Sequence, residues 1–137
     1  MENYVHKVNY YETDKMGITH HSNYIRWMEE ARINYLEKNG LGYDKLEEQG
    51  IISPVIGLEC EYKTPTTFND CVEIIVSFEE YNGVTLTVKY TMTNQQTNAI
   101  VLQGKSKHCF TNSNGRPIIL KRSFPLVDDK LKELIGK

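Results

Sequence analysis

The chain has 137 residues, of which 39% are hydrophobic and 25% are charged, a composition typical of one soluble globular domain spanning residues 1–137. Lys and Arg number 16 and Asp and Glu number 18, giving a formal net charge of −2. This balance argues against a basic nucleic-acid binder, and the interspersed charges argue against an acidic disordered tail. Because we find no signal peptide and no apolar run long enough for a membrane span, we expect a cytoplasmic protein.

The first 50 residues predict one short strand and one long helix. Residues 4–11 read as a short strand. After it, apolar side chains recur at intervals of three and four residues, the period of an amphipathic helix; they are Tyr24, Trp27, Met28, Ala31 and Tyr35. Ser22 or Asn23 is expected to cap the start of this helix, and Gly40 is expected to end it in a left-handed conformation. A second helical turn is expected over residues 43–49.

The remaining chain alternates between apolar and polar residues, the pattern of strands with one buried face. We expect strands over residues 56–62, 72–78, 84–93 and 98–111, and a short amphipathic helix after Pro125. The pair Asn82-Gly83 separates the second and third of these strands and predicts a two-residue hairpin turn. Those two strands should therefore be antiparallel neighbours.

The order of elements predicts an α+β fold, with one long helix covering the apolar face of a five-stranded, mostly antiparallel sheet. No internal repeat or long linker divides the chain, so we expect a single domain. One helix scarcely covers five strands. We therefore expect a partner subunit that closes the sheet or its edge, in a homodimer or homotetramer.

The cysteine and histidine spacing indicates neither a disulfide framework nor a metal site. The three cysteines are Cys60, Cys71 and Cys109. They are odd in number and widely spaced, so we expect buried structural thiols. His20 and His21 are adjacent and would point about 100° apart on a helix, which disfavours a shared metal ion. We expect no metal and no cofactor, and we expect His108 to be a hydrogen-bonded core residue.

The stretch from residue 10 to residue 24 carries the most chemical information. It joins the first strand to the long helix and contains Asp14, a glycine at position 17 that permits a tight turn, and His21 at the helix start. A helix N-terminus offers unpaired backbone N–H groups and a partial positive charge. A carboxylate beside such donors can attack a carbonyl or activate water, while an N–H stabilises the oxyanion. The alternative is that Asp14 only caps the turn.

The same stretch resembles the signature of a known family. Tyr11, Asp14, Gly17, Ile18, His21, Asn23 and Tyr24 are followed by Trp27-Met28-Glu29 and Ala31-Arg32. Together these residues resemble the motif of hotdog-fold acyl-CoA thioesterases, in the hydroxybenzoyl-CoA thioesterase branch that includes the Tol–Pal-associated enzymes. The motif covers residues 10–32, and the remaining chain shares only the layout of elements. The resemblance implies a hotdog fold, in which a five-stranded antiparallel sheet wraps around one long central helix.

The resemblance also implies roles for individual residues. Asp14 matches the catalytic carboxylate, acting as nucleophile or as general base. His21 matches the position whose backbone N–H polarises the thioester, and its imidazole can also contact substrate. Gly17, Asn23 and Tyr24 match the turn and helix-entry positions, which we assign to substrate binding. Family members hydrolyse coenzyme A thioesters as dimers or tetramers with the active site at a subunit interface, and they need no metal.

Several side chains have both a binding and a structural interpretation. His20 stands where the family often has an aromatic residue, which changes the mouth of the expected pocket. Arg32 either pairs with Glu29 or binds a coenzyme A phosphate. Tyr24 and Trp27 either belong to the helix core or contact the acyl group. The cations Lys105, Lys107, Lys121 and Arg122 are either solvated or meet the nucleotide phosphates.

Three other functions compete with acyl-CoA hydrolysis. A thioesterase for acyl carrier protein would be favoured by a basic docking patch, and the sequence shows no clear one. A non-catalytic acyl-CoA-binding protein would not need Asp14 beside the helix start. A hotdog dehydratase needs a catalytic histidine paired with an acidic residue in another arrangement. Acyl-CoA hydrolysis is therefore the leading hypothesis, with acyl length and aliphatic or aromatic character left open.

Overall fold

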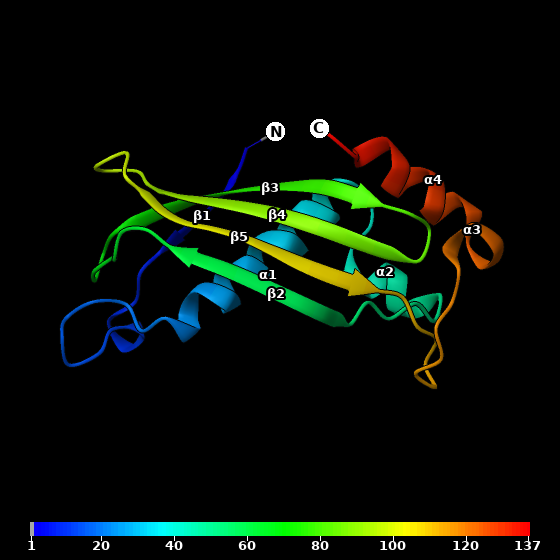
Figure 1. Ribbon diagram of the computed structural model, residues 1–137, viewed down its shortest axis with the longest axis horizontal. Coiled ribbons are helices and arrows are strands. Elements are labelled where there is room, and N and C mark those ends of the chain that lie inside the picture. Colours follow the sequence, from blue (N-terminus) through cyan, green and yellow to red (C-terminus); the bar gives the residue numbers. More distant parts are fainter. Residues whose placement is uncertain (1) are drawn as a thin grey trace. The chain divides into compact units, whose positions relative to one another are not determined.

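The structure, a computed structural model, describes residues 2–137. In chain order its elements are β1 (Tyr4–Lys7), the 3-10 helix η1 (Tyr10–Glu12), α1 (Ser22–Lys38), α2 (Tyr43–Glu48), β2 (Val55–Tyr62), β3 (Cys71–Tyr81), β4 (Thr85–Asn94), β5 (Ile100–Cys109), α3 (Leu120–Ser123) and α4 (Pro125–Leu134) (Figure 1). The strands form one sheet in the order β1-β3-β4-β5-β2. β1 runs antiparallel to β3, with Tyr4 opposite Ile74. The predicted α+β fold with a five-stranded antiparallel sheet is confirmed.

The N-terminal prediction is wrong at two points. β1 ends at Lys7, and residues 10–12 form η1 instead of continuing the strand. The turn is set by a capping box, in which the Asn9 backbone N–H donates to the Glu12 carboxylate at 2.8 Å. α1 already begins at Ser22. Ser22 and Asn23 therefore lie within the first turn and do not cap it from outside. The Asn23 side-chain amide donates to the Glu12 and His20 carbonyls.

The strands after residue 50 follow the predicted alternation. In β4 the buried apolar positions are Leu86, Val88, Tyr90 and Met92. The hairpin is longer than the predicted two residues, because β3 ends at Tyr81 and β4 begins at Thr85. Asn82 Oδ1 accepts hydrogen bonds from the backbone N–H groups of Val84 (2.9 Å) and Thr85 (2.7 Å). Gly83 takes a left-handed conformation with φ of 89°, so the side chain of Asn82, and not a second left-handed residue, completes the turn.

The chain divides into two compact units, and unit 1 consists of Met1–Tyr35, Cys60–Val76 and Tyr90–Gly104. Its core includes side chains from α1 and three strands: Trp27, Met28, Ala31, Val72, Ile74, Tyr90, Met92 and Leu102. Arg32 is buried with them and donates from Nη1 to the Tyr90 hydroxyl at 3.0 Å. Within unit 1, the first part of α1 therefore packs on strand residues, as the helical period predicted.

Unit 2 consists of Leu36–Glu59, Ser77–Lys89 and Lys105–Lys137. Its core includes Leu36, Leu46, Ile51, Phe78, Leu86, Val88, Leu120 and Leu131. α4 is tied to β3 through Asp128, whose carboxylate accepts hydrogen bonds from the Tyr81 hydroxyl (2.5 Å) and from Lys132 Nζ (2.8 Å). Burial alone would raise the pKa of Asp128, but these bonds outweigh burial and lower that pKa. The predicted C-terminal helix is confirmed, whereas α3 was not predicted.

The cysteine prediction needs one correction. All three thiols are free, as expected, but each is half-buried and not fully buried. His108 is buried and lies 2.7 Å from the Ser106 hydroxyl through Nε2, which confirms a hydrogen-bonded core histidine. Gly40 has a φ of 77° after the end of α1, as predicted. Within residues 2–137, no helix combines the length and the apolar character that crossing a membrane requires.

Candidate active site

Asp14 lies at the base of a tight turn between η1 and α1. Its backbone N–H donates to the Ile18 carbonyl, and the Gly17 N–H donates back to the Asp14 carbonyl, each at 2.9 Å. One carboxylate oxygen, Oδ1, accepts the Met16 N–H at 2.8 Å. Gly17 has a φ of 79°, a conformation that glycine adopts without strain. Asp14 therefore does order the turn, as the structural alternative predicted, and its side chain is half-buried.

The second carboxylate oxygen of Asp14 differs from the first. Oδ2 has no hydrogen-bond partner among residues 2–137. A carboxylate held by one oxygen in a turn keeps the other oxygen for a water molecule or an electrophile. The structural role of Asp14 and a chemical role are therefore compatible.

The start of α1 is ordered by three hydrogen bonds, two of which reach η1. The His20 N–H donates to the Glu12 carbonyl at 2.8 Å. Asn23 Nδ2 donates to the same carbonyl at 3.0 Å and to the His20 carbonyl at 3.2 Å. Among residues 2–137, the His21 backbone N–H has no hydrogen-bond partner. An unpaired N–H at the N-terminal end of a helix is the donor that the predicted oxyanion role requires.

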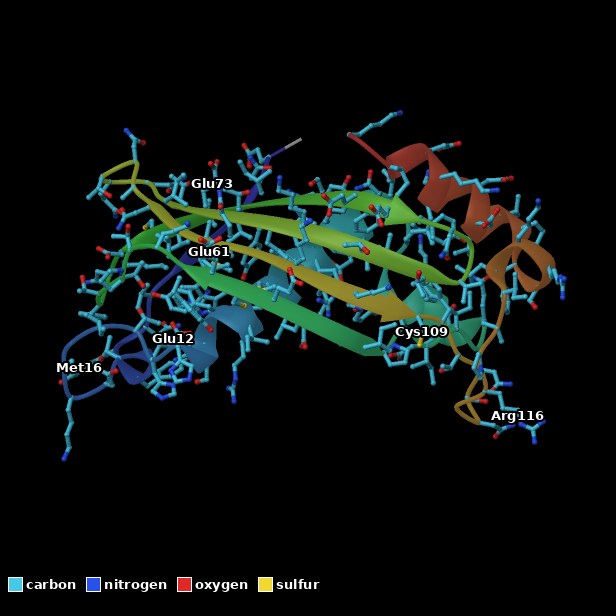
Figure 2. All side chains as sticks on the ribbon, viewed as in Figure 1. Glu12, Met16, Glu61, Glu73, Cys109 and Arg116 are labelled. Carbon is cyan, nitrogen blue, oxygen red and sulfur yellow. The ribbon has the colours of Figure 1, made fainter. Side chains whose placement is uncertain are left out.

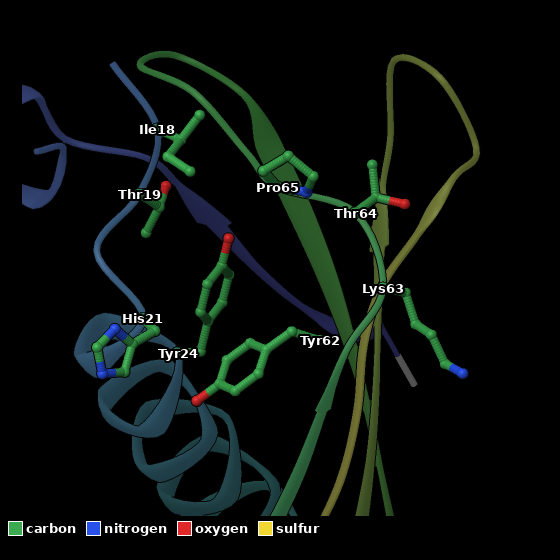
Figure 3. A pocket seen from close by; sticks show the side chains of 8 residues that line it. All are labelled: Ile18, Thr19, His21, Tyr24, Tyr62, Lys63, Thr64 and Pro65. Carbon is green, nitrogen blue, oxygen red and sulfur yellow. The ribbon is translucent and has the colours of Figure 1, made fainter. Parts of the chain in front are cut away.

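A pocket of about 310 Å³ opens beside this helix end within unit 1. It is lined by Ile18, Thr19, His21, Tyr24, Tyr62, Lys63, Thr64 and Pro65 (Figure 3). The rings of Tyr24 and Tyr62 lie 5.7 Å apart, and those of His21 and Tyr62 meet edge to face at 6.3 Å. The Tyr24 hydroxyl lies 3.0 Å from Thr66 Oγ1, which fixes that ring. The pocket is mostly apolar, with aromatic walls and few polar groups.

The predicted site residues separate into two groups. His21 and Tyr24 line the pocket, whereas Asp14 and Gly17 lie in the adjacent turn and do not line it. The link between the groups is Ile18, which lines the pocket and accepts the Asp14 N–H through its carbonyl. Asn23 orders the helix entry through its two carbonyl contacts and lies outside the pocket lining.

Half of the pocket wall comes from the residues that end and follow β2, which the sequence did not single out. Lys63 and Thr64 are anchored because their backbone N–H groups both donate to the Val101 carbonyl, at 2.9 and 3.2 Å. Tyr62 and Pro65 complete this wall. The only feature of the sequence that pointed to this wall was Tyr62, a large aromatic residue at the end of a predicted strand.

Several side chains with two interpretations are resolved by their contacts. Trp27 is fully buried, which supports the core interpretation, while Tyr24 is both buried and part of the pocket. Arg32 is also buried, which disfavours contact with a coenzyme A phosphate. Lys105 pairs with Glu79 at 3.0 Å. Three-residue clusters of His, Cys, Asp or Glu suited to a metal are absent from residues 2–137, and the expectation of a metal-free reaction remains a prediction.

Cys60 is the cysteine nearest in sequence to the pocket wall, and it is a poor nucleophile. Burial raises the pKa of the Cys60 thiol, with a smaller opposing effect from its hydrogen bond with Tyr62. Its sulfur lies 3.8 Å from the Met28 sulfur. A thiol with a raised pKa is largely protonated at neutral pH, and the thiolate is the reactive form. This environment supports a structural role for Cys60.

Comparisons with known proteins agree on one family. Residues 8–134 match the model of the thioesterase-like superfamily. YneP of Bacillus subtilis strain 168, named as an acyl-CoA thioesterase, is 31% identical over 119 residues, which cover 87% of this chain and 86% of YneP. The structure of DHNA-CoA thioesterase from Staphylococcus aureus is 32% identical with a TM-score of 0.91, covering 96% of this chain and 89% of that one. The AQ1494 protein of Aquifex aeolicus is 34% identical with a TM-score of 0.85, covering 93% and 97%.

Proposed function

The chain belongs to the thioesterase-like superfamily, and we propose that it is an acyl-CoA thioesterase in which Asp14 is the catalytic carboxylate. The observation that carries the proposal is the apolar pocket at the N-terminal end of α1, beside the turn that holds Asp14. Similarity to YneP and to DHNA-CoA thioesterase supports a coenzyme A thioester as substrate. The products are a free acid and coenzyme A.

The reaction uses the two groups found unpaired at the site. As a general base, Asp14 Oδ2 takes a proton from water while the water oxygen bonds to the thioester carbonyl carbon. The His21 backbone N–H stabilises the oxyanion that forms. The C–S bond then breaks, and the departing thiolate of coenzyme A receives the proton. As a nucleophile, Asp14 would instead attack the carbonyl, expel the thiolate and form an anhydride that water hydrolyses.

The pocket receives the acyl group. Its volume of about 310 Å³ and the rings of Tyr24 and Tyr62 suit an apolar acyl chain or an aryl ring. Gly17 and Asn23 contribute indirectly, Gly17 by permitting the turn and Asn23 by holding the helix entry. The reaction needs no metal or cofactor.

A second copy of the chain completes the enzyme as a homodimer or homotetramer. β2 is an edge strand of the sheet. Its apolar side chains are exposed on both faces: Val55, Ile56, Leu58 and Tyr62. Long, apolar edge strands are normally covered or paired, because their free backbone groups and side chains promote association. Tyr62 belongs to β2 and to the pocket, so a partner seated on β2 would lie beside the acyl site.

The proposal also covers the bounds of the domain and the cellular compartment of the protein. The match over residues 8–134 supports a single domain spanning residues 1–137. The three free thiols support a reducing compartment, which favours the cytoplasm.

A hydrolysis screen tests the proposal. Purified protein is assayed with acetyl-, hexanoyl-, palmitoyl-, benzoyl- and DHNA-CoA, and free thiol release is measured. Matched acyl carrier protein thioesters are assayed in parallel. We expect turnover of at least one coenzyme A thioester. Turnover of carrier protein thioesters alone would establish the acyl carrier protein alternative, and tight acyl-CoA binding without turnover would establish a non-catalytic binding protein.

A further inference from the structure

A buried carboxylate lies two residues before Asp14. Glu12 is 5% exposed. Its Oε1 accepts the Asn9 backbone N–H and lies opposite His6 Nε2, both at 2.8 Å, and its Oε2 accepts the Trp27 indole N–H at 2.7 Å. Residues from β1, from α1 and from the N-cap of η1 thus converge on one side chain, which Figure 2 labels near the N-terminal end of α1.

His6 extends this cluster to a second carboxylate. Its Nδ1 lies 3.2 Å from Glu30 Oε2, which also accepts the Tyr4 hydroxyl at 2.9 Å. The His6 ring stacks on Trp27 with a centroid distance of 4.4 Å. Both ring nitrogens face carboxylate oxygens, and ionised carboxylates only accept hydrogen bonds. The His6 ring is therefore held between the carboxylates of Glu12 and Glu30.

The surroundings keep Glu12 ionised. Burial by itself would raise the pKa of this carboxyl. The hydrogen bonds from Asn9, His6 and Trp27 outweigh burial and lower the pKa. The Glu12 carboxylate is thus a charged anchor that lies buried in unit 1. Its burial carries a desolvation cost that the three hydrogen-bonding residues offset.

The backbone of the same residue holds the catalytic loop. The Glu12 carbonyl accepts the His20 N–H and Asn23 Nδ2. Only Thr13 separates Glu12 from Asp14, and Thr13 is bridged to Thr19 across the turn. The side chain of Glu12 therefore fixes one end of the Asp14 turn, while its carbonyl fixes the start of α1.

From this arrangement we propose that Glu12, held by His6 and Trp27, is a positioning residue that sets Asp14 against the N-terminal end of α1. The inference rests on the proposed thioesterase function for its catalytic consequence. Its structural consequence, the order of residues 14–21, is independent of that function. Glu12 acts through the loop and does not itself touch the substrate.

Two variants weaken the anchor to different extents. Glu12→Gln keeps the size of the side chain but removes its charge. It also replaces one of the two acceptor oxygens with an amide N–H₂, which cannot accept from the donors of His6, Asn9 and Trp27. Trp27→Phe keeps an aromatic ring against His6, removes the bond to Oε2 and leaves a small cavity, because Trp27 is fully buried. It carries the test if Glu12→Gln does not fold. The matched control is Asp128→Asn in unit 2, because Asp128 is also a buried carboxylate held by hydrogen bonds.

The first measurement is amide hydrogen exchange, which needs no substrate. In Glu12→Gln we expect the amides of Asp14, Gly17 and His20 to exchange at least about tenfold faster than in the wild type, because their closed loop opens more often. Trp27→Phe should show a smaller increase. Asp128→Asn should leave these three amides unchanged even where its melting temperature falls by a similar amount. Unchanged exchange in both anchor variants would overturn the proposal.

The second measurement is steady-state kinetics on the best thioester. We expect kcat of Glu12→Gln to fall by about 10²-fold, the effect of misplacing a catalytic group by about an ångström, with KM changed by less than about threefold. Asp128→Asn should retain wild-type kcat. A fall in kcat without faster loop exchange would overturn the positioning role. Absence of hydrolysis by the wild type would refute the thioesterase function and leave the exchange result to decide the loop.

Discussion

Asp14 has two separable contributions in its turn, one from each carboxylate oxygen. Oδ1 accepts the Met16 N–H, and the second oxygen is the proposed base. Replacement by Asn keeps an oxygen for Met16, so the turn should persist, since Asn and Asp serve comparably in such positions. Because the amide lacks charge and basicity, kcat should fall by at least about 10²-fold with little change in KM. Wild-type kcat in a variant with a native circular dichroism spectrum would leave Asp14 with its structural role alone.

Tyr62 lines the pocket and is 49% exposed, so its side chain can be shortened without leaving a cavity in the core. Tyr62→Ala should remove a ring contact with the acyl group and raise KM for benzoyl- or DHNA-CoA by up to about tenfold, the effect of one aromatic contact. KM for acetyl-CoA should change less, since its acyl group is small. Phe68→Ala is the control, because Phe68 is 51% exposed and does not line the pocket. Equal KM changes for all substrates, or the same change in the control, would place the acyl site elsewhere.

The sequence identified only part of the site at this scale. Asp14, Gly17 and His21 were found because a carboxylate, a tight turn and a helix start follow one another within eight residues. The opposite wall at Tyr62 could not be found in this way, since it is about forty residues away and only the fold brings it to Tyr24. The Glu12 cluster was missed for the same reason, because its partners belong to separate elements.

At the scale of the elements, α4 is held to β3 by a buried, charged side chain, Asp128. Asp128 is 2% exposed and holds α4 to β3 through Tyr81, and its pKa is lowered from the ordinary value of 3.8 by bonds that outweigh burial. A lowered pKa means that the stabilisation is fully present above pH 3.8 and is lost as the pH falls through the folded-state pKa. Asp128→Asn should therefore cost about 2 kcal/mol of unfolding free energy at pH 7, the scale of hydrogen bonds to a charged group.

The pH dependence of that loss is the diagnostic measurement. Urea unfolding at pH 7 and at pH 3 should show the difference between wild type and Asp128→Asn shrinking in acid, because below pH 3.8 the Asp128 carboxyl of the unfolded wild type takes up a proton more readily than that of the folded protein. Asp129→Asn is the control, since Asp129 is the exposed neighbour on the same helix. A difference that stays constant with pH would mean that packing, and not charge, is lost in Asp128→Asn.

Element prediction succeeded where the period was long and failed where local capping took over. α1 is long enough for its apolar residues to recur over several helical turns, and β4 is long enough for buried and less buried residues to alternate several times. Their periods were therefore unambiguous. The strand predicted over residues 4–11 stops at Lys7 because the side chain of Glu12 caps the Asn9 N–H and favours a 3-10 turn. α3 has four residues, too few to show a helical period.

For the whole molecule, the main expectation still to be tested is assembly through β2. The sequence predicted a partner because one helix scarcely covers five strands, and the exposed apolar residues of the β2 edge strand give that partner a place. A stable interface usually buries about 800 Å² from each subunit. β2, paired with the same strand of a second copy and covered together with its exposed apolar side chains, could supply such an area.

Leu58→Lys tests this assembly, because a charge at the centre of β2 must be desolvated if a partner covers it. Light scattering should give the mass of a dimer or tetramer for the wild type and a shift toward the monomer, at micromolar concentration, for the variant. Activity should fall in parallel, since Tyr62 of the same strand lines the pocket. Ile75→Lys is the control: Ile75 and Leu58 are both 42% exposed, but Ile75 lies on β3, inside the sheet. If the wild type is a fully active monomer, the active site does not need a second subunit. If Leu58→Lys and Ile75→Lys dissociate equally, the loss of assembly is not specific to β2, and the proposed interface is wrong.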